Sequence, residues 1–232
     1  RQLFTIADPQ FAHKFNSYAS PTPIIENGRL YCHFGANGSA CVDTRAGKIV
    51  WRNQEVEVQH ENGPGSTPVL WKDLLIFHMD GSDQQFVVAL EKATGKERWR
   101  TARSGTMHEN PQLKKSYGTP IIRHIKDRPV LLSPGSNWLY AYDPANGKEL
   151  WKVDRPSDGV AECFHSYASP TAHKYGKVNV VITHGHDYTI GHHPKSGKEL
   201  WRIGDLNPKN QYNRTLRFVA SPVAHKGLVV AP

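Results

Sequence analysis

Short apolar runs alternate with tight polar turns along the chain. Typical runs are rich in β-branched and aromatic residues and lie at 30–34, 86–90 and 178–182. Glycine, proline, asparagine and aspartate separate them, which is typical of β-strands joined by turns. No segment keeps a 3.6-residue apolar period, so helix is not expected. The pattern predicts an all-β chain.

The runs belong to a unit that repeats. A cassette ending in Gly-Lys-x-x-Trp recurs about every 50 residues, and its tryptophans are Trp51, Trp99, Trp151 and Trp201. A second landmark, serine or threonine followed by proline, has the same period and opens each unit, with its prolines at Pro21, Pro68, Pro120, Pro170 and Pro222. A fixed period of this size is the signature of a repeat fold.

Each repeat has room for four strands, which predicts the antiparallel blade of a β-propeller. A β-sandwich also contains many short strands, but it does not require the same tryptophan in every unit. One propeller domain is therefore predicted over 1–232. Residues 1–14 resemble the tail of a preceding unit, and the blades are expected at 17–59, 63–103, 117–155 and 167–205, with a partial blade at 218–232.

Small residues accompany each tryptophan. The residues ten positions before the tryptophans are Cys41, Ala89, Ala141 and Gly191, and those four positions before them are Gly47, Gly95, Gly147 and Gly197. An indole buries a large apolar area, and small residues provide the flat floor that it needs. We interpret the tryptophans and glycines of the cassettes as structural docking residues rather than as a ligand-stacking site.

The complete cassette Ala-x-Asp-x-x-x-Gly-Lys-x-x-Trp at 141–151 resembles the repeat of the pyrroloquinoline-quinone-like (PQQ-like) β-propeller family. That superfamily contains quinoprotein dehydrogenases and non-enzymatic scaffolds of the BamB-like outer-membrane assembly type. In it the cassette docks a tryptophan between neighbouring blades. The other cassettes depart from the pattern: Cys41 replaces the alanine, Glu91 replaces the aspartate, and Gly191 and His193 replace both.

The resemblance extends from about residue 15 to the end of the chain. It implies a propeller of seven or eight blades, so this chain is expected to be a piece of a longer propeller. The resemblance identifies the fold and does not by itself imply that a cofactor binds.

Antiparallel strand order sends the second-to-third loop and the connection to the next blade to one face. That face has long connections, roughly 53–65, 102–116, 154–165 and 204–217, whereas the Gly-Lys face has tight turns. Binding residues concentrate on long loops over a rigid scaffold, so any function is expected on the long-loop face.

Polar residues gather on this face. His184, His186 and Asp187 are ligand types suited to a transition metal, but their spacing is common in solvated loops. They are weak candidates, and no metal site is predicted. The segment from Asp80 to Asp83 resembles part of a calcium loop but lacks the glycine and the distal glutamate of an EF-hand.

Two functions fit the chain. The preferred one is a non-catalytic binding or scaffold module without a cofactor, which contacts a protein or cell-envelope partner through its long-loop face in the periplasm or at the cell surface. The alternative is a quinoprotein dehydrogenase that uses PQQ and calcium to oxidise alcohols or sugars. The resemblance implies a catalytic base, acidic and amide calcium ligands and, in many members, adjacent cysteines for such an enzyme. The chain has no adjacent cysteines, and no catalytic residue is assigned.

A hydrolase is not supported, because the sequence has no nucleophile elbow or metalloprotease motif.

Charge changes this picture little. The net charge is +8 and the isoelectric point is about 9.4. The lysines are spread out, which indicates a solvated basic surface, whereas a nucleic-acid footprint would need a clustered stripe. No run approaches the roughly 18 apolar residues of a membrane span. No signal sequence is visible, but the sequence starts at Arg1, so that absence excludes nothing.

The chain has three cysteines, Cys32, Cys41 and Cys163, and no C-x-x-C motif. Cys32 and Cys41 flank a turn at 36–38, so a cross-strand disulfide is one prediction for an oxidising compartment. Buried free thiols are the preferred prediction, because free cysteine is among the most buried residue types.

Overall fold

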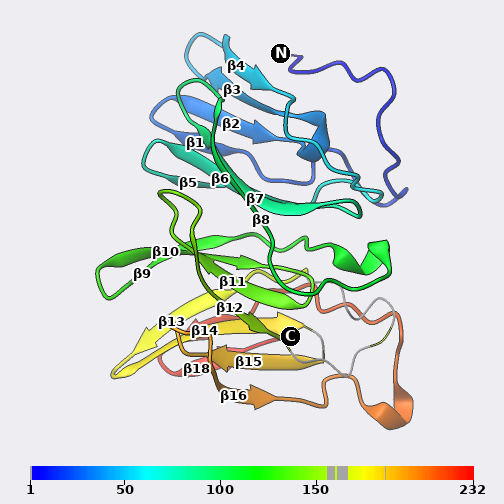
Figure 1. Cartoon of the computed structure of the whole chain (residues 1–232), viewed down its shortest axis with the longest axis vertical. Helices are drawn as coiled ribbons and strands as arrows, with labels where there is room; N and C mark the ends of the chain where they lie inside the picture. The colour runs from blue at the N-terminus through cyan, green and yellow to red at the C-terminus, as the bar shows by residue number, and fades with distance from the viewer. Residues whose placement is uncertain (1, 156–159, 161–166, 186) are drawn as a thin grey trace. The chain divides into compact units, whose positions relative to one another are not determined.

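The computed structural model describes residues 2–155, 160, 167–185 and 187–232. These residues form strands β1 to β18 and single 3₁₀ turns at Gly35–Asn37, Pro111–Lys114 and Lys209–Gln211 (Figure 1). Within this part of the chain, no helix is long and apolar enough to span a bilayer. The chain divides into two compact units, Arg1–Gly105 and Thr106–Pro232.

The first unit holds two antiparallel blades whose strands follow chain order. The first blade consists of β1 (Ile24–Glu26), β2 (Arg29–His33), β3 (Ser39–Asp43) and β4 (Ile49–Asn53). The second blade consists of β5 (Val69–Trp71), β6 (Leu74–Asp80), β7 (Gln85–Glu91) and β8 (Glu97–Ala102).

The second unit holds the third and fourth blades and a β-hairpin, β17 (Val223–His225) and β18 (Leu228–Val230). The third blade consists of β9 (Ile121–Ile125), β10 (Arg128–Pro134), β11 (Trp138–Tyr142) and β12 (Glu149–Asp154). The fourth consists of β13 (Thr171–Tyr175), β14 (Val178–Gly185), β15 (Tyr188–His192) and β16 (Glu199–Ile203). The all-β prediction of four-stranded antiparallel blades is confirmed.

The segment before the first blade contains no strand among residues 2–14. It is bonded to the first blade and the connection after it: Arg52 Nε donates to Leu3 O at 2.5 Å, and Gln10 Nε2 donates to Val58 O at 2.8 Å.

The third and fourth strands of every blade meet in the same irregular turn. The pairing shifts just after the small residue opposite the tryptophan, in the pairs Cys41–Trp51, Ala89–Trp99, Ala141–Trp151 and Gly191–Trp201. In each blade the glycine of the cassette then adopts a positive φ, at 61°, 73°, 72° and 70°. Glycine takes this left-handed conformation without steric strain, which accounts for its recurrence.

The acidic residue of the cassette organises this turn. Asp43 Oδ1 accepts hydrogen bonds from the backbone N–H groups of Arg45 and Ala46 at 3.0 and 2.8 Å. Where Glu91 replaces the aspartate, its longer side chain accepts a hydrogen bond from Thr94 Oγ1 at 2.9 Å. The departure from the repeat pattern therefore keeps a side-chain bond inside the turn.

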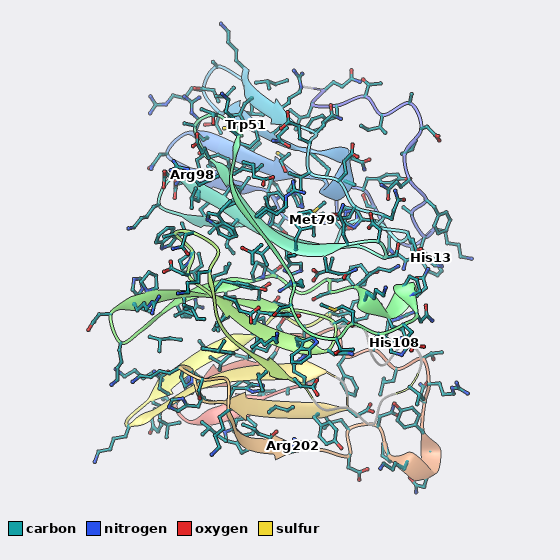
Figure 2. The ribbon with its side chains drawn as sticks, in the orientation of Figure 1. His13, Trp51, Met79, Arg98, His108 and Arg202 are labelled. Carbon is teal, nitrogen blue, oxygen red and sulfur yellow. The ribbon has the colours of Figure 1, made fainter. Side chains whose placement is uncertain are left out.

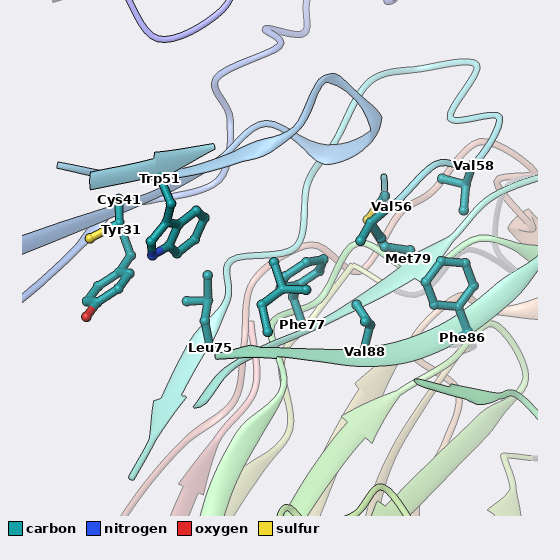
Figure 3. Close-up of a cluster of buried hydrophobic side chains, with 11 residues drawn as sticks. Tyr31, Cys41, Trp51, Val56, Val58, Leu75, Phe77, Met79, Phe86 and Val88 are labelled. Carbon is teal, nitrogen blue, oxygen red and sulfur yellow. The ribbon is translucent and has the colours of Figure 1, made fainter. Parts of the chain in front are cut away.

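The core of the first unit lies between its two sheets. Figure 3 shows Trp51 and Cys41 of the first blade facing Leu75, Phe77 and other apolar side chains of the second. Alternate residues of β6 supply this face, as the two-residue period of a strand requires. In the second unit, the buried apolar cluster consists of Ile125, Val130, Leu132, Leu139, Ala141 and Val181.

In each unit, the indole of one tryptophan lies against the cassette turn of the next blade. Trp51 Nε1 donates to Lys92 O at 2.8 Å, and a Cβ at Gly95 would lie 2.5 Å from Trp51 Cε3. In the second unit, a Cβ at Gly197 would lie 2.6 Å from Trp151 Cε3. We propose that this contact sets the spacing of neighbouring blades.

The serine and threonine hydroxyls of the second landmark also join blades. Thr67 Oγ1 accepts a hydrogen bond from the backbone N–H of Thr22 at 3.0 Å. In the second unit, Ser169 Oγ accepts one from Thr119 at 2.8 Å, and Ser221 Oγ accepts one from Ser169 at 2.9 Å. These bonds give a reason for a hydroxyl residue before the proline.

Cys32 and Cys41 are free and buried. The register pairs Tyr31 with Cys41 and Cys32 with Ala40, so the two thiols are offset by one residue. Side chains one residue apart in register point to opposite faces of a sheet, which rules out the cross-strand disulfide. Cys163 lies outside the described residues.

The docking contact predicts unequal effects for two similar substitutions. Gly95→Ala adds a methyl group that meets the Trp51 ring, and alanine also strains the positive φ. We expect it to lower the free energy of unfolding by about 3 kcal/mol. Chemical denaturation followed by tryptophan fluorescence measures the loss.

Gly47→Ala is the matched control. Gly47 has a positive φ of 61°, but nothing lies within 4 Å of a Cβ added there. We expect a loss of about 1 kcal/mol from backbone strain alone. Equal losses for the two variants would contradict the docking role of the Trp51 contact.

Candidate functional site

His184 lies near the end of β14 and is 2% exposed. Its Nδ1 is 2.8 Å from Thr189 Oγ1, and its Nε2 is 2.8 Å from the carbonyl oxygen of Pro232. Because a carbonyl only accepts, Nε2 carries the proton and Nδ1 accepts from the threonine hydroxyl. Burial lowers the pKa of His184. Both ring nitrogens are therefore engaged, so a metal ion would have to displace one of these bonds. His186 lies outside the described residues.

Asp187 follows β14 and has a positive φ of 67°. Its side chain is buried, and Tyr212 donates a hydrogen bond from its hydroxyl to Oδ2 at 2.9 Å. Oδ1 is also buried, and it has no hydrogen-bond partner in the described part of the chain. A buried acceptor without a donor is energetically costly. Among the residues described, no three His, Cys, Asp or Glu side chains form a metal-binding group.

Asp187 lines a cavity of about 530 Å³ at one corner of the fourth blade. The connection that follows β16 supplies most of the remaining wall, with Asp205, Asn207, Lys209 and Tyr212. Tyr188, the first residue of β15, completes it. The structure thus brings together the segment around 183–187 and the connection at 204–217, two regions that the sequence analysis assigns to the same face.

Local contacts hold the cavity walls in place. The Asn207 side chain donates to Asn213 O at 3.0 Å and accepts from Asn213 N at 2.9 Å, which closes the loop between them. On the other wall, the Arg202 guanidinium on β16 (Figure 2) lies 5.1 Å from the centre of the Tyr188 ring. A Cβ at Gly204 would lie 2.7 Å from the same ring, so a side chain there would push the ring aside.

Three buried histidines occupy one repeated position. His33, His78 and His184 each lie two residues beyond the residue that pairs with the small residue of the cassette. His33 Nδ1 is 2.9 Å from Ser39 Oγ, which parallels the bond between His184 and Thr189. Counting from the cassette reveals this pattern in the sequence, whereas residue type alone does not.

A buried arginine closes the same corner in the second blade. Arg103 donates from Nε and Nη2 to the two carboxylate oxygens of Asp80 at 3.0 and 2.9 Å, and both side chains are 1% exposed. The Asp80 carboxylate is therefore neutralised internally, so the resemblance to a calcium loop does not hold. Arg155 of the third blade, also four residues after its tryptophan, donates to the carbonyls of Gly135 and Ser136 at 3.3 and 3.2 Å.

Four-stranded antiparallel blades that share one cassette define the chain as a β-propeller of PQQ-like repeats. Its sequence matches, over residues 36–231, the family described as outer membrane protein assembly factor BamB. The chain belongs to that family.

Solved structures agree on the fold. BamB from Moraxella catarrhalis is 17% identical with a TM-score of 0.57, over 79% of this chain and 51% of that one. A quinohemoprotein alcohol dehydrogenase from Comamonas testosteroni is 16% identical with a TM-score of 0.59, over 91% of this chain and 38% of that one. A europium-containing methanol dehydrogenase is 12% identical with a TM-score of 0.58, over 79% and 41%.

These identities show the fold alone, and the chain spans about half or less of the length of each of these structures. A comparison with curated proteins finds no match.

The buried histidines predict a loss of stability in mild acid. Burial, with a smaller effect of His60, lowers the pKa of His33 to about 3, and burial lowers the pKa of His192 to about 4. The unfolded chain titrates near 6.5, so it binds more protons than the folded chain below that pH. Each neutral histidine makes its full contribution to the free energy of unfolding above pH 6.5, and this contribution declines as the pH falls toward the folded pKa.

Each of these histidines should lower the free energy of unfolding by about 2 kcal/mol at pH 5 relative to pH 7. His33→Gln should remove the part of this pH dependence that His33 contributes. Denaturation curves at both pH values measure the difference. Equal stability of the parent protein at pH 5 and pH 7 would refute the prediction.

Proposed function

We propose that this chain is a non-catalytic binding module that engages a protein or cell-envelope partner through its long-loop face. The observation that carries the proposal is the cavity at the corner of the fourth blade. It combines a concave shape, a buried carboxylate oxygen without a donor among the described residues and walls held by local hydrogen bonds. Such convergence of a few polar groups in a concave site is typical of binding sites.

The cassette side has a different character. The Trp51 indole and the Gly95 turn pack against each other, so these cassette residues serve the contact between blades. Binding on the long-loop face leaves these contacts between blades intact.

Two polar residues that could act as a base on this face are engaged internally. Asp80 is paired with Arg103, and both nitrogens of His184 are bonded. A general base needs a lone pair directed at its substrate. The described residues therefore support binding better than proton transfer.

The alternative, a PQQ-dependent dehydrogenase, draws on the likeness to quinohemoprotein alcohol dehydrogenase. Calcium is bound by several carboxylate and amide oxygens. The described residues do not fit this requirement, because Arg103 occupies both oxygens of Asp80, and Asp83 Oδ1 accepts from the backbone N–H of Gln59 at 2.9 Å.

The proposed location is the periplasm or the cell envelope. The family description, outer membrane protein assembly factor, supports it. The same description supports a protein partner rather than a nucleic acid.

Cofactor loading separates the two functions. We expect the protein to show no saturable binding when PQQ and calcium are added together at micromolar concentration, and no dye reduction with ethanol or glucose. Fluorescence titration and a dye-linked assay measure these two properties. A calcium-free quinoprotein alcohol dehydrogenase reconstituted in parallel is the positive control. Stoichiometric binding of PQQ with turnover would contradict the binding-module proposal.

A further inference from the structure

We propose that the cavity of the fourth blade binds a cationic group, the guanidinium or ammonium of an arginine or lysine side chain presented by the partner. This inference deepens the binding role proposed above and rests on it. It places partner binding at one site, centred on Asp187, and names a cationic side chain as the group that is bound.

The first argument is the state of the Asp187 carboxylate. The side chain is 4% exposed, and within the described residues only one of its two oxygens has a donor. Tyr212 cannot serve the second oxygen as well, because its single proton is directed at Oδ2. The phenol oxygen is itself held in place by the backbone N–H of Val160 at 3.1 Å. The site therefore contains a carboxylate oxygen that has no hydrogen-bond donor among the described residues.

The second argument comes from the other blades. Four residues after the tryptophan, the second and third blades carry a buried arginine, Arg103 and Arg155, that fills this corner. Arg103 pairs with a carboxylate of its own blade through two hydrogen bonds. The fourth blade has Asp205 at that position. At this position of the repeat, the fourth blade therefore has an acid where the second and third blades have an arginine.

The third argument is the chemistry of the walls. A chain with a net charge of +8 here presents two carboxylates against one lysine, Lys209. Tyr212 supplies aromatic surface, which attracts cations and packs against the apolar stem of a long basic side chain, whereas Arg202 already lies on the Tyr188 ring. A guanidinium in this place would form a charge-assisted hydrogen bond with the Asp187 carboxylate once the buried Oδ1 turns toward the cavity.

The test uses two small probes that differ by one charge. N-acetyl-arginine methylamide carries the guanidinium, and N-acetyl-citrulline methylamide is its neutral isostere. Binding is followed by NMR titration of the amide signals of Asp187, Tyr188 and Asn207. We expect the arginine probe to shift these signals with millimolar affinity and the citrulline probe to bind about tenfold more weakly, the effect of one charge-assisted bond.

Asp187→Asn is the decisive variant. Asparagine tolerates the positive φ and keeps an oxygen for the Tyr212 hydroxyl, but it removes the charge. We expect about tenfold weaker binding of the arginine probe. We also expect an unchanged or higher melting temperature, because the variant removes a buried carboxylate with an unbonded oxygen. Asp73→Asn, an exposed site in the first unit, makes the same charge change and should alter neither property.

Several results would overturn the inference. The first is the absence of shifts with about 20 mM arginine probe, and the second is equal affinity for the arginine and citrulline probes. The third is tighter binding of an uncharged sugar, methyl glucoside, than of the arginine probe. The fourth is a marked fall in the melting temperature of Asp187→Asn without weaker binding of the arginine probe. None of these results bears on PQQ binding. Conversely, PQQ turnover would overturn the proposed function while leaving the charge preference of the cavity measurable.

Discussion

The rest of the structure depends on the contact between an indole and the glycine turn of the next blade. A blade of four strands cannot bury its faces alone, so it must pack against its neighbours. Trp51 provides that packing for the first unit: its ring covers Gly95, and its N–H is bonded to Lys92 O. The bulge, the positive φ of the glycine and the side-chain bond of the cassette acid hold the turn in the shape that receives the ring. Each feature of the repeated motif therefore serves one interface.

This constraint separates the two ends of each blade. At the cassette end of the second and fourth blades, a residue larger than glycine would meet the indole of the preceding blade. At the other end, the connections differ from blade to blade while the strands stay alike. The second blade fills its corner with the pair formed by Asp80 and Arg103, and in the third blade Arg155 donates to backbone carbonyls. The fourth blade leaves a cavity beside Asp187. Variation at these corners on a constant scaffold is how repeat folds acquire binding sites.

Features that repeat along the chain could be predicted from the sequence. The strands and the four-stranded blades follow from the two landmarks and their common period. The predicted blades differ from the observed strands mainly at their ends, where long connections were counted with the blade.

Features that depend on contacts between distant residues could not be predicted. Tyr212 and Asp187 are 25 residues apart, and they meet only because the loop after β16 folds back on β15. The partner of Trp51 lies in the next repeat, so the cassette alone does not reveal which glycine receives the ring. The disulfide prediction for Cys32 and Cys41 required the register, which the turn at Gly35–Asn37 offsets by one residue. The histidine candidates were chosen by residue type, whereas the structure shows that the His184 ring is bonded on both sides.

Hydrogen exchange of the Trp51 indole N–H is the most direct measurement of the central contact. If the ring docks on the second blade as described, this proton exchanges only when the first unit unfolds, because it is bonded to Lys92 O and the side chain is 7% exposed. Its protection factor should then match that of the slowest backbone amides of β6 and β7. Exchange at the rate of a solvent-exposed indole would show that the blades are not held together by this contact.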